Sequence, residues 1–495
     1  MLGEEALPTP GLTAIVAALR GVLEPEDVLT DPARLRTYEC DGLAHLRCVP
    51  GLVVLPGSAE QVRAVVRACR DAGVPFVARG AGTGLSGGAL PRGDGVLVVT
   101  SRLRAAPEVD VANQRAVVDP GVANLDVSRA AGPVGYYYAP DPSSQQVCSI
   151  GGNVAENSGG AHCLKYGFTV NHVTGLDIVT PDGQAVSLGG GKSLDPPGYD
   201  LLGAFIGSEG TLGIATKVVV RLVRTPESVA TLLAAFPSTD EAGAAVSAII
   251  AAGVVPAAIE MMDALAIEAA EAAVHCDYPG GAGAVLIVEL DGPGVEVDTA
   301  FGEVTDHCRD HGAFEIRVAA DAAERALFWK GRKSAFAAVG RISPDYIVQD
   351  GVIPRTALPE VLRRIAALAA DTGVRVANVF HAGDGNLHPL VLFDESVDGE
   401  AERAEEVSGA ILDLCIELGG SITGEHGVGA DKARYLPRMF GEDDLDTMQM
   451  LRCAFDPAGL CNPGKIFPTP RLCGEVPGVH RAVHPLVAAG QAEQF

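Results

Sequence analysis

The chain has 495 residues, of which 47% are hydrophobic and 20% charged, values typical of a globular protein with a large core. Its formal net charge of −26 argues against a nucleic-acid groove, which needs clustered Lys and Arg, and against adhesion to an anionic membrane surface. This length favours about three domains.

The chain carries no visible targeting or membrane segment. Its first residues, Met-Leu-Gly-Glu-Glu, lack the basic start and apolar core of a signal peptide. The uncharged run 242–259 is mostly Ala and contains Pro256, so we interpret it as a helix running into a strand rather than a membrane span. We expect a cytoplasmic protein, either free or peripheral to the inner membrane through partners.

The chain has 11 cysteines, and none are arranged Cys-x-x-Cys. In a chain of this size without a signal peptide, this pattern indicates reduced, buried thiols. It also indicates that the chain itself encodes no iron–sulfur cluster.

The first 100 residues predict a β-α-β start. Apolar residues at helical spacing predict a helix within 1–45, and strands are expected at 51–56 and 75–79. Between these strands, Ser58 is a plausible N-cap for a helix.

A glycine-rich loop, 80–88, follows the second strand. Its glycines permit positive φ and expose consecutive backbone N–H groups, which suits a pyrophosphate. The Gly-x-Gly-x-Gly spacing and the strand at 95–99 that follows do not fit the Rossmann fingerprint, and no Lys follows for a P-loop.

Two more glycine-dense loops occur before residue 225, at 140–160 and 207–214, each next to a predicted strand (175–180 and 218–222). Three such loops need more close backbone approach than ordinary turns do. They predict a large phosphorylated ligand.

A second group of residues carries metal chemistry. A predicted strand at 374–380 ends in His381-Ala-Gly-Asp-Gly-Asn-Leu-His388, and Glu425-His426 lies between glycines further on. Two imidazoles and one carboxylate leave positions open on a divalent ion, as a catalytic site requires. The alternative is a set of solvated loop histidines.

Taken together, these loops and motifs resemble the vanillyl-alcohol oxidase / p-cresol methylhydroxylase (PCMH) superfamily. Within it, the chain resembles the FAD-linked D-2-hydroxy acid dehydrogenases, which include the FAD-linked subunit of bacterial glycolate oxidase. The resemblance covers roughly residues 35–470.

The resemblance implies an α+β fold. A two-subdomain PCMH-type FAD-binding domain is expected at 1–225, a cap domain with an antiparallel sheet at 226–420, and a segment returning to the flavin at 421–468. Residues 469–495 are expected to be a tail. The hydrophobic pattern agrees for the cap, with strands at 230–236, 254–262, 284–290 and 314–318 and helices at 239–252, up to about 275, and at 296–310.

The resemblance also implies FAD as cofactor. Because loop 80–88 contains no His, we expect the FAD to be bound non-covalently. The residues expected to bind it are Arg79, Gly80, Ala81, Gly82, Thr83, Gly84, Leu85, Ser86, Pro140, Asp141, Ser143, Ser144, Gly151, Gly152, Asn153, Glu156, Asn157, Gly207, Glu209, Gly213, Ile214 and Asn462.

The implied reaction is oxidation of a 2-hydroxy acid to the 2-oxo acid, with hydride passing to flavin N5. His381, His388 and Glu425 would hold a divalent metal (Zn, Mn or Fe), and His426 would be the base, with a pKa near neutrality. Arg332 would bind the substrate carboxylate through its planar fork.

Two positions favour a small acid such as glycolate or D-lactate, since Leu390 and Val348 replace polar residues that bind larger substrates in relatives. A D-2-hydroxyglutarate-type dehydrogenase, a zinc-dependent hydrolase and a catalytically silent FAD subunit are the alternatives. The electron acceptor is open among oxygen, a quinone and a partner, and the resemblance implies a second flavin subunit and an iron–sulfur subunit.

Overall fold

The computed structural model describes residues 9–190 and 198–468. The first sheet has the order β1-β2-β4-β3, with β2, β4 and β3 parallel and β1 antiparallel to β2. Its strands are β1 (Val28–Leu29), β2 (Leu52–Val54), β3 (Phe76–Arg79) and β4 (Val96–Val99).

The predicted β-α-β start is confirmed. Helix α3 (Ala59–Ala72) connects β2 to β3, and the Ser58 hydroxyl caps it by accepting a hydrogen bond from the Gln61 N–H at 3.2 Å. Its buried face packs against α1 (Pro10–Leu19) and the sheet, so the first glycine loop leaves the sheet from a fixed edge.

The second sheet of this half is antiparallel, with the order β5-β6-β10-β8-β9. Helix α5 (Ile150–Glu156) packs against β10 and carries the second glycine loop; the Ser149 hydroxyl caps it. The strands of this sheet are β5 (Glu108–Asp110), β6 (Arg115–Val118), β8 (Val173–Val179), β9 (Ala185–Gly189) and β10 (Ile214–Arg221). This half also contains the helices α4 (Asn124–Ala131), α6 (Cys163–Tyr166) and α7 (Leu201–Phe205). A separate two-stranded pair is formed by β7 (Tyr136–Tyr137) and β11 (Val223–Arg224).

The cap is built on an antiparallel sheet in which every named pair of strands is antiparallel. Alternate residues face opposite layers: Leu232, Ala234 and Phe236 pack with α8, α10, α12 and α13, whereas Leu233 and Ala235 pack with α9 and α11. The strands are β12 (Ser228–Phe236), β13 (Ala258–Asp263), β14 (Ala284–Gly292), β15 (Glu315–Val318), β16 (Asp345–Val348), β17 (Gly351–Val352), β18 (Val376–His381), β19 (Asn386–Leu387) and β20 (Pro389–Phe393).

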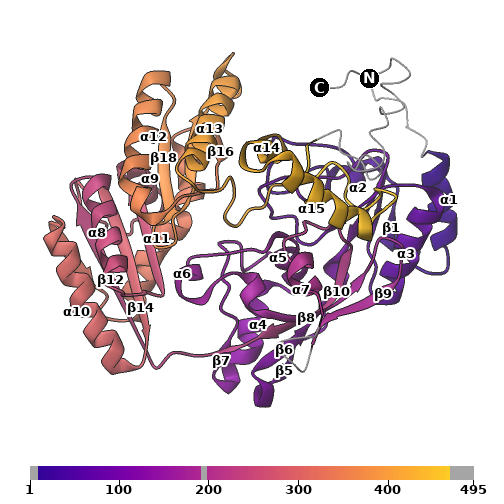
Figure 1. Cartoon of the computed structure of the whole chain (residues 1–495), viewed down its shortest axis with the longest axis horizontal. Helices are drawn as coiled ribbons and strands as arrows, with labels where there is room; N and C mark the ends of the chain where they lie inside the picture. The colour runs from indigo at the N-terminus through magenta and orange to yellow at the C-terminus, as the bar shows by residue number, and fades with distance from the viewer. Residues whose placement is uncertain (1–8, 191–197, 469–495) are drawn as a thin grey trace.

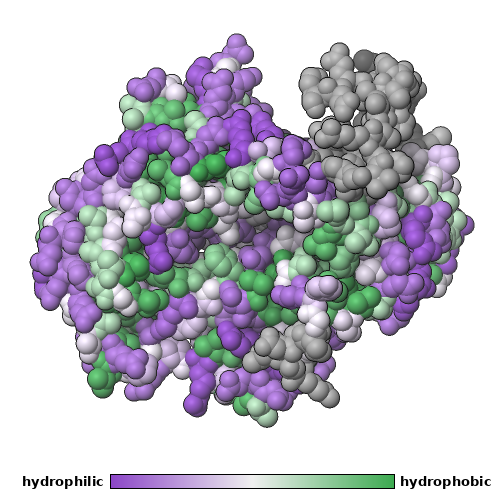
Figure 2. Space-filling view, viewed as in Figure 1, coloured by the Kyte–Doolittle hydropathy of each residue, from purple (hydrophilic) through white to green (hydrophobic). Residues whose placement is uncertain are grey.

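The cap strands and helices expected from the hydrophobic pattern are present, with helices on both faces of the sheet (Figure 1). Figure 2 shows that hydrophilic residues cover much of the outer edge of these helices, as the negative net charge of the chain suggests. The helices are α8 (Thr239–Ala251), α9 (Ala264–Val274), α10 (Gly294–Asp310), α11 (Ala322–Ala338), α12 (Leu358–Thr372) and α13 (Glu400–Glu417).

After α13 the chain returns to the first sheet. Helices α14 (Leu436–Met439) and α15 (Glu442–Phe455) lie over the amino-terminal half, shown in yellow in Figure 1. Beyond them, the Asn462 N–H donates to the Phe76 carbonyl at 2.8 Å, and the Phe76 N–H donates to the Leu460 carbonyl at 2.9 Å. This pairing fixes the segment against β3, next to the first glycine loop.

The expectation of reduced thiols is confirmed for nine described cysteines, seven of which are buried, and is wrong for Cys453. Cys453 is disulfide-bonded, whereas Cys40, Cys48, Cys69, Cys148, Cys163, Cys276, Cys308, Cys415 and Cys461 are free. A disulfide needs only that two Cα atoms come within a few ångströms of each other, which tertiary packing decides. The absence of Cys-x-x-Cys spacing therefore could not exclude it.

In the described parts of the chain, none of the helices is both long and apolar enough to cross a membrane.

Candidate active site

A cavity of about 980 Å³ runs between the glycine loops and the cap. Its walls come from all three glycine loops, from the cap residues Phe336 and His388, and from Glu425 and His426. The cavity therefore joins the predicted nucleotide site to the predicted metal site. The expected FAD-binding residues that line it are Arg79, Gly80, Ala81, Gly82, Thr83, Gly84, Leu85, Ser143, Ser144, Gly151, Gly152, Asn153, Glu156, Glu209, Gly213 and Ile214.

The glycines of these loops allow close backbone approach. A Cβ on Gly80 would lie 2.1 Å from the Ser149 hydroxyl, and one on Gly88 would lie 2.4 Å from a carboxylate oxygen of Glu156. A larger residue at either position would have to displace a cavity wall. The donor-rich, glycine-lined walls fit a pyrophosphate-bearing cofactor.

Other residues expected to bind FAD lie behind the cavity wall. The Ser86 carbonyl accepts hydrogen bonds from the Ala430 and Asp431 N–H groups, and the Asn462 amide donates to the carbonyls of Gly88 and Glu209. These residues tie the carboxyl-terminal segment to the first and third loops. A direct role of Ser86 and Asn462 in FAD binding stays a prediction.

Four more of the residues expected to bind FAD also make hydrogen bonds to other groups of the protein. The Asp141 carboxylate binds His162, and the Asn157 side chain accepts a hydrogen bond from the Val170 N–H. The Pro140 carbonyl accepts from the Asn124 amide at 3.1 Å, and the Gly207 N–H donates to the Val154 carbonyl at 2.9 Å.

Sequence reasoning missed one wall of the cavity, formed by residues 42–47 together with Tyr346. Residues 42–47 carry no glycine-loop pattern, so nothing in their sequence predicts a ligand. Only the packing of this loop over the first glycine loop reveals it, since a Cβ on Gly42 would lie 2.7 Å from the Gly84 carbonyl.

The predicted metal ligands converge. His381 ends β18, His388 lies between β19 and β20, and the loop after α13 brings Glu425 to them. The ligand atoms of these three residues all lie within 4.8 Å of one another. His388 Nε2 lies 3.0 Å from Glu425 Oε1, and His381 Nε2 lies 3.5 Å from the same oxygen.

The surroundings of His381 suit a metal ligand. Its Nδ1 lies 2.7 Å from the carboxylate of Glu260 on β13, whereas its Nε2 is buried and has no hydrogen-bond partner. Burial alone would lower the pKa of His381, but Glu260 and Glu425 raise it well above its usual value. Burial alone would raise the pKa of Glu425, but the two histidines lower it. A carboxylate behind the ring and a free nitrogen in front are the usual support of a metal-bound histidine.

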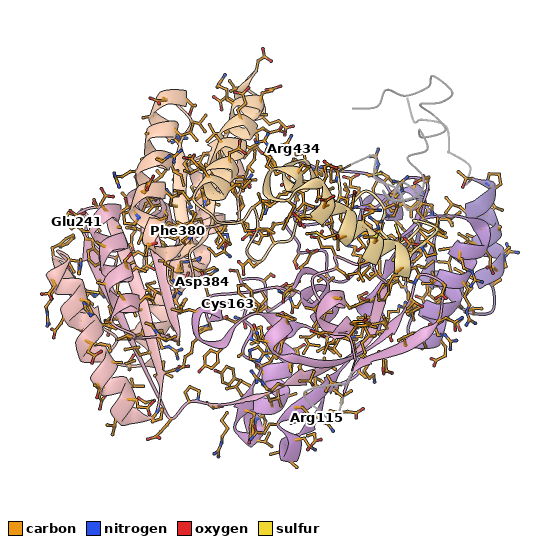
Figure 3. The ribbon with its side chains drawn as sticks, viewed as in Figure 1. Arg115, Cys163, Glu241, Phe380, Asp384 and Arg434 are labelled. Carbon is orange, nitrogen blue, oxygen red and sulfur yellow. The ribbon has the colours of Figure 1, made fainter. Side chains whose placement is uncertain are left out.

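His388 also belongs to a second set, in which its ligand atom lies within 4.8 Å of those of Asp350 and His426. Asp350 lies 3.8 Å from His388 Nδ1 and 4.0 Å from His426 Nδ1. Neither Asp350, which lies between β16 and β17, nor Glu260 on β13 was identified from the sequence, because a single acid outside a motif carries no signal. Figure 3 shows Asp384 of the same cap motif close to Cys163, at the junction with the FAD-binding half.

His426 lies at the cavity beside this cluster. Its ring stacks on that of His388, with centroids 5.0 Å apart and an interplanar angle of 8°. Burial lowers the pKa of His426 to about 4, below the near-neutral value expected from the sequence. The imidazole is therefore neutral at pH 7, but it is a weaker base than a group with the expected near-neutral pKa.

Arg332 lies on α11 with its side chain buried. Its Nε is 2.7 Å from Glu260, and its guanidinium lies 5.8 Å from the centroid of Phe336, which lines the cavity. Lys333, the next residue, lines the cavity directly. A role of Arg332 in carboxylate binding stays a prediction.

The apolar positions noted in the sequence lie side by side. Val348 lines the cavity and is paired with Leu390 in the β16–β20 register, where Leu390 is fully buried. Val348 and Phe336 give this end of the cavity an apolar lining.

Comparisons with known proteins agree with this geometry. A family model described as "FAD binding domain" matches residues 50–189, and one described as "FAD linked oxidases, C-terminal domain" matches residues 225–466. The chain is thus an FAD-linked oxidoreductase with an FAD-binding domain and a carboxyl-terminal oxidase domain.

Several curated relatives are similar over nearly the whole chain. Glycolate oxidase subunit GlcD of Escherichia coli (strain K12) is 51% identical, over 96% of this chain and 95% of its own length. Glycolate oxidase subunit GlcD of Bacillus subtilis is 38% identical, over 90% and 94%. D-lactate dehydrogenase of Anaerostipes hadrus is 32% identical, over 90% and 95%. The chain therefore belongs to the family of FAD-linked 2-hydroxy acid oxidoreductases that contains these proteins.

Solved structures with low identity share the fold. p-Cresol methylhydroxylase matches with a TM-score of 0.78 at 16% identity, covering 93% of this chain and 98% of its own. 4-Ethylphenol oxidase from Gulosibacter chungangensis matches with a TM-score of 0.77 at 18% identity, covering 94% and 99%. The expected PCMH-type fold, with an antiparallel cap, is confirmed.

Proposed function

We propose that this FAD-dependent oxidoreductase oxidises glycolate or D-lactate with the help of a divalent metal. The supporting observation is the convergence of His381, His388 and Glu425 beside the FAD cavity. His381, His388 and Glu425 would hold the ion. Bound FAD supplies the hydride acceptor, and the ion supplies a Lewis acid for the substrate oxygen.

His426 is the proposed proton acceptor. Its Nδ1 is buried and faces Asp350 at 4.0 Å, so Nε2 is the nitrogen left for the substrate hydroxyl. Because burial keeps the ring neutral, Nε2 carries a lone pair at pH 7. Stacking on His388 holds the ring plane fixed relative to the metal ligands.

The proposed carboxylate partner is Arg332, with Lys333 as a second cation at the cavity wall. Glu260 would hold the Arg332 guanidinium in place from behind through the contact at Nε. The apolar lining at Val348 and Phe336 would leave a distal carboxylate without a partner, which favours a small monocarboxylic acid.

We also propose that electrons leave through a separate protein. Two of the relatives are named as subunits of a glycolate oxidase, and such an arrangement would pair this chain with a second flavin subunit and an iron–sulfur subunit. Association with the inner membrane would then depend on those partners.

Anaerobic reduction of the bound flavin tests the proposal. The purified holoprotein is mixed with glycolate, D-lactate, L-lactate or D-2-hydroxyglutarate, and bleaching of the flavin absorbance is followed with and without a chelator. Fast bleaching by glycolate or D-lactate, lost on chelation and restored by Mn²⁺ or Zn²⁺, is the expected result. Equal rates after complete metal removal would contradict the metal role, and preference for 2-hydroxyglutarate would contradict the substrate class.

A further inference from the structure

Asp350 is a fully buried carboxylate directly before β17, behind the proposed metal and base residues. It is held between two parts of the site. On one side, the neighbouring Gln349 carbonyl contacts His388 Nδ1 at 3.4 Å, and on the other, β17 pairs with Ser421 at the start of the loop that carries Glu425.

The Asp350 carboxylate organises that loop. One of its oxygens accepts hydrogen bonds from the backbone N–H groups of Gly424 (3.0 Å), Glu425 (3.2 Å) and His426 (2.8 Å). The Thr423 hydroxyl also donates to it, at 2.5 Å, and accepts from the Gly427 N–H at 3.0 Å. The loop is thus wrapped around an anion, as successive N–H groups of a backbone nest are.

Lys432 provides the balancing charge. Its ammonium lies 3.5 Å from Asp350, and its side chain is 1% exposed. A buried carboxylate and a buried ammonium are each costly alone, so each depends on the other and on the loop donors. Truncating either would leave an uncompensated charge beneath the site.

Because Asp350 binds the N–H groups of Glu425 and His426 themselves, it fixes where both side chains begin. In this loop conformation the Glu425 carboxylate meets His381 and His388. We propose that Asp350, paired with Lys432, positions Glu425 and His426 and thereby sets the affinity of the site for a divalent ion. This inference rests on the proposed function.

A direct role of Asp350 as a metal ligand is less well supported. The oxygen nearest Lys432 is already occupied by four donors, and the other lies 3.4 Å from the Glu425 N–H. His381, which has a free nitrogen, lies in the other set of possible ligands.

The test measures metal affinity in the FAD-loaded full-length protein. Mn²⁺ or Zn²⁺ is titrated into chelated wild type, Asp350→Asn and the control Asp263→Asn, with the flavin spectrum recorded to check the fold. Asp263 is a half-buried carboxylate that also accepts hydrogen bonds from backbone N–H groups, those of Ala266 and Asn378, but it lies outside the cluster. We expect Asp350→Asn to bind the ion about 10–100-fold more weakly, the usual effect of losing an outer support, and Asp263→Asn to bind as wild type does.

Wild-type affinity in a folded Asp350→Asn variant, or equal losses in both variants, would overturn the inference. Complete loss of binding in Asp350→Asn, as in His381→Ala, would instead identify Asp350 as a ligand and also overturn it. A wild type that binds no ion would overturn the proposed metal chemistry and the inference with it.

If Asp350→Asn does not fold, Thr423→Val provides the second variant. It keeps the side-chain shape but removes the hydroxyl that links Asp350 to the Gly427 N–H. We expect several-fold weaker metal binding with an unchanged flavin spectrum, and unchanged binding would contradict the positioning role.

Discussion

His388 and His426 lie face to face, with ring centroids 5.0 Å apart and planes inclined by 8°, although 37 residues lie between them in the sequence. One ring belongs to the proposed metal cluster and the other is the proposed base. The stack therefore fixes the distance between the two chemical functions of the site. It also makes them separable by mutation.

Replacement of His426 with Ala should stop flavin reduction without removing FAD. The variant keeps His381, His388 and Glu425 but loses the proton acceptor at Nε2. General-base catalysis typically raises a reaction rate by about 10²–10⁴-fold, so the rate of flavin reduction should fall by that factor. Anaerobic stopped-flow bleaching with glycolate and D-lactate measures the loss, and the flavin absorbance measures occupancy. A near-normal rate would show that another group takes the proton. His307→Ala, on the cap helix α10, is the matched control and should keep the wild-type rate.

Replacement of Glu260 with Gln should weaken metal binding through His381. The carboxylate at 2.7 Å from Nδ1 holds the ring with Nε2 toward Glu425, and a neutral amide would hold it less strongly. Loss of such a support typically costs about 10–100-fold in metal affinity or activity. Reduction rates at increasing Mn²⁺ should recover toward the wild-type maximum at saturating ion. No recovery at any concentration would place the defect elsewhere, for example in Arg332, the other partner of Glu260.

Replacement of Arg332 with Ala should raise KM and destabilise the cap. The variant loses the proposed carboxylate partner and leaves Glu260 buried with His381 as its remaining charge partner, a change that costs about 3–5 kcal/mol in comparable ion pairs. Chemical unfolding gives the free-energy change, and flavin reduction at varied glycolate gives KM. Lys330→Ala removes an exposed lysine of the same helix and should change neither. If the variant is less stable but its KM for glycolate is unchanged, Arg332 stabilises the cap and does not bind the substrate carboxylate.

Stability should fall at alkaline pH because of His162, which joins the FAD-binding half to the cap. Its ring nitrogens lie 2.8 Å from Asp141 and 3.2 Å from Glu289. Burial alone would lower the pKa of His162, but these carboxylates raise it to about 10. Since the unfolded value is about 6.5, the stabilisation is fully present below about pH 6.5 and is lost as the pH rises through about 10.

His162→Gln tests this, because an amide does not titrate. The variant should be about 2 kcal/mol less stable than wild type near pH 6, as expected for hydrogen bonds to charged groups, and the difference should shrink by pH 10. Thermal unfolding across this pH range measures it. The stability of the control His311→Gln, at the carboxyl-terminal end of α10, should change with pH as that of wild type does. A loss of stability in His162→Gln that stays the same at every pH would contradict the assignment.

Local sequence patterns predicted most regular elements. The apolar run in 230–236 predicted β12, and Ser58 followed by the spaced apolar residues of α3 predicted the first helix of the β-α-β unit. These predictions succeed because strand and helix periodicities are properties of neighbouring residues. The motifs around His381 and Glu425 likewise identify the candidate ligands, because each motif is a short run of adjacent residues.

Contacts between distant segments lay beyond such patterns. Glu260 behind His381 comes from a strand 121 residues earlier, and the loop 42–47 reaches the cavity from outside every motif. A short sequence pattern cannot predict a contact between two residues that are brought together only by the order of strands in a sheet.

By itself, then, the sequence determined the kinds of elements, the glycine-lined cofactor loops and the residue types able to hold a metal, since these depend on local geometry and side-chain chemistry. Only the tertiary structure decided which carboxylates support them. The strand pairing that places Glu260 opposite His381, and the loop wrapped on Asp350, depend on segments far apart in the chain. Burial then set the charge states, lowering the pKa of His426 to about 4, and burial is a property of the whole fold.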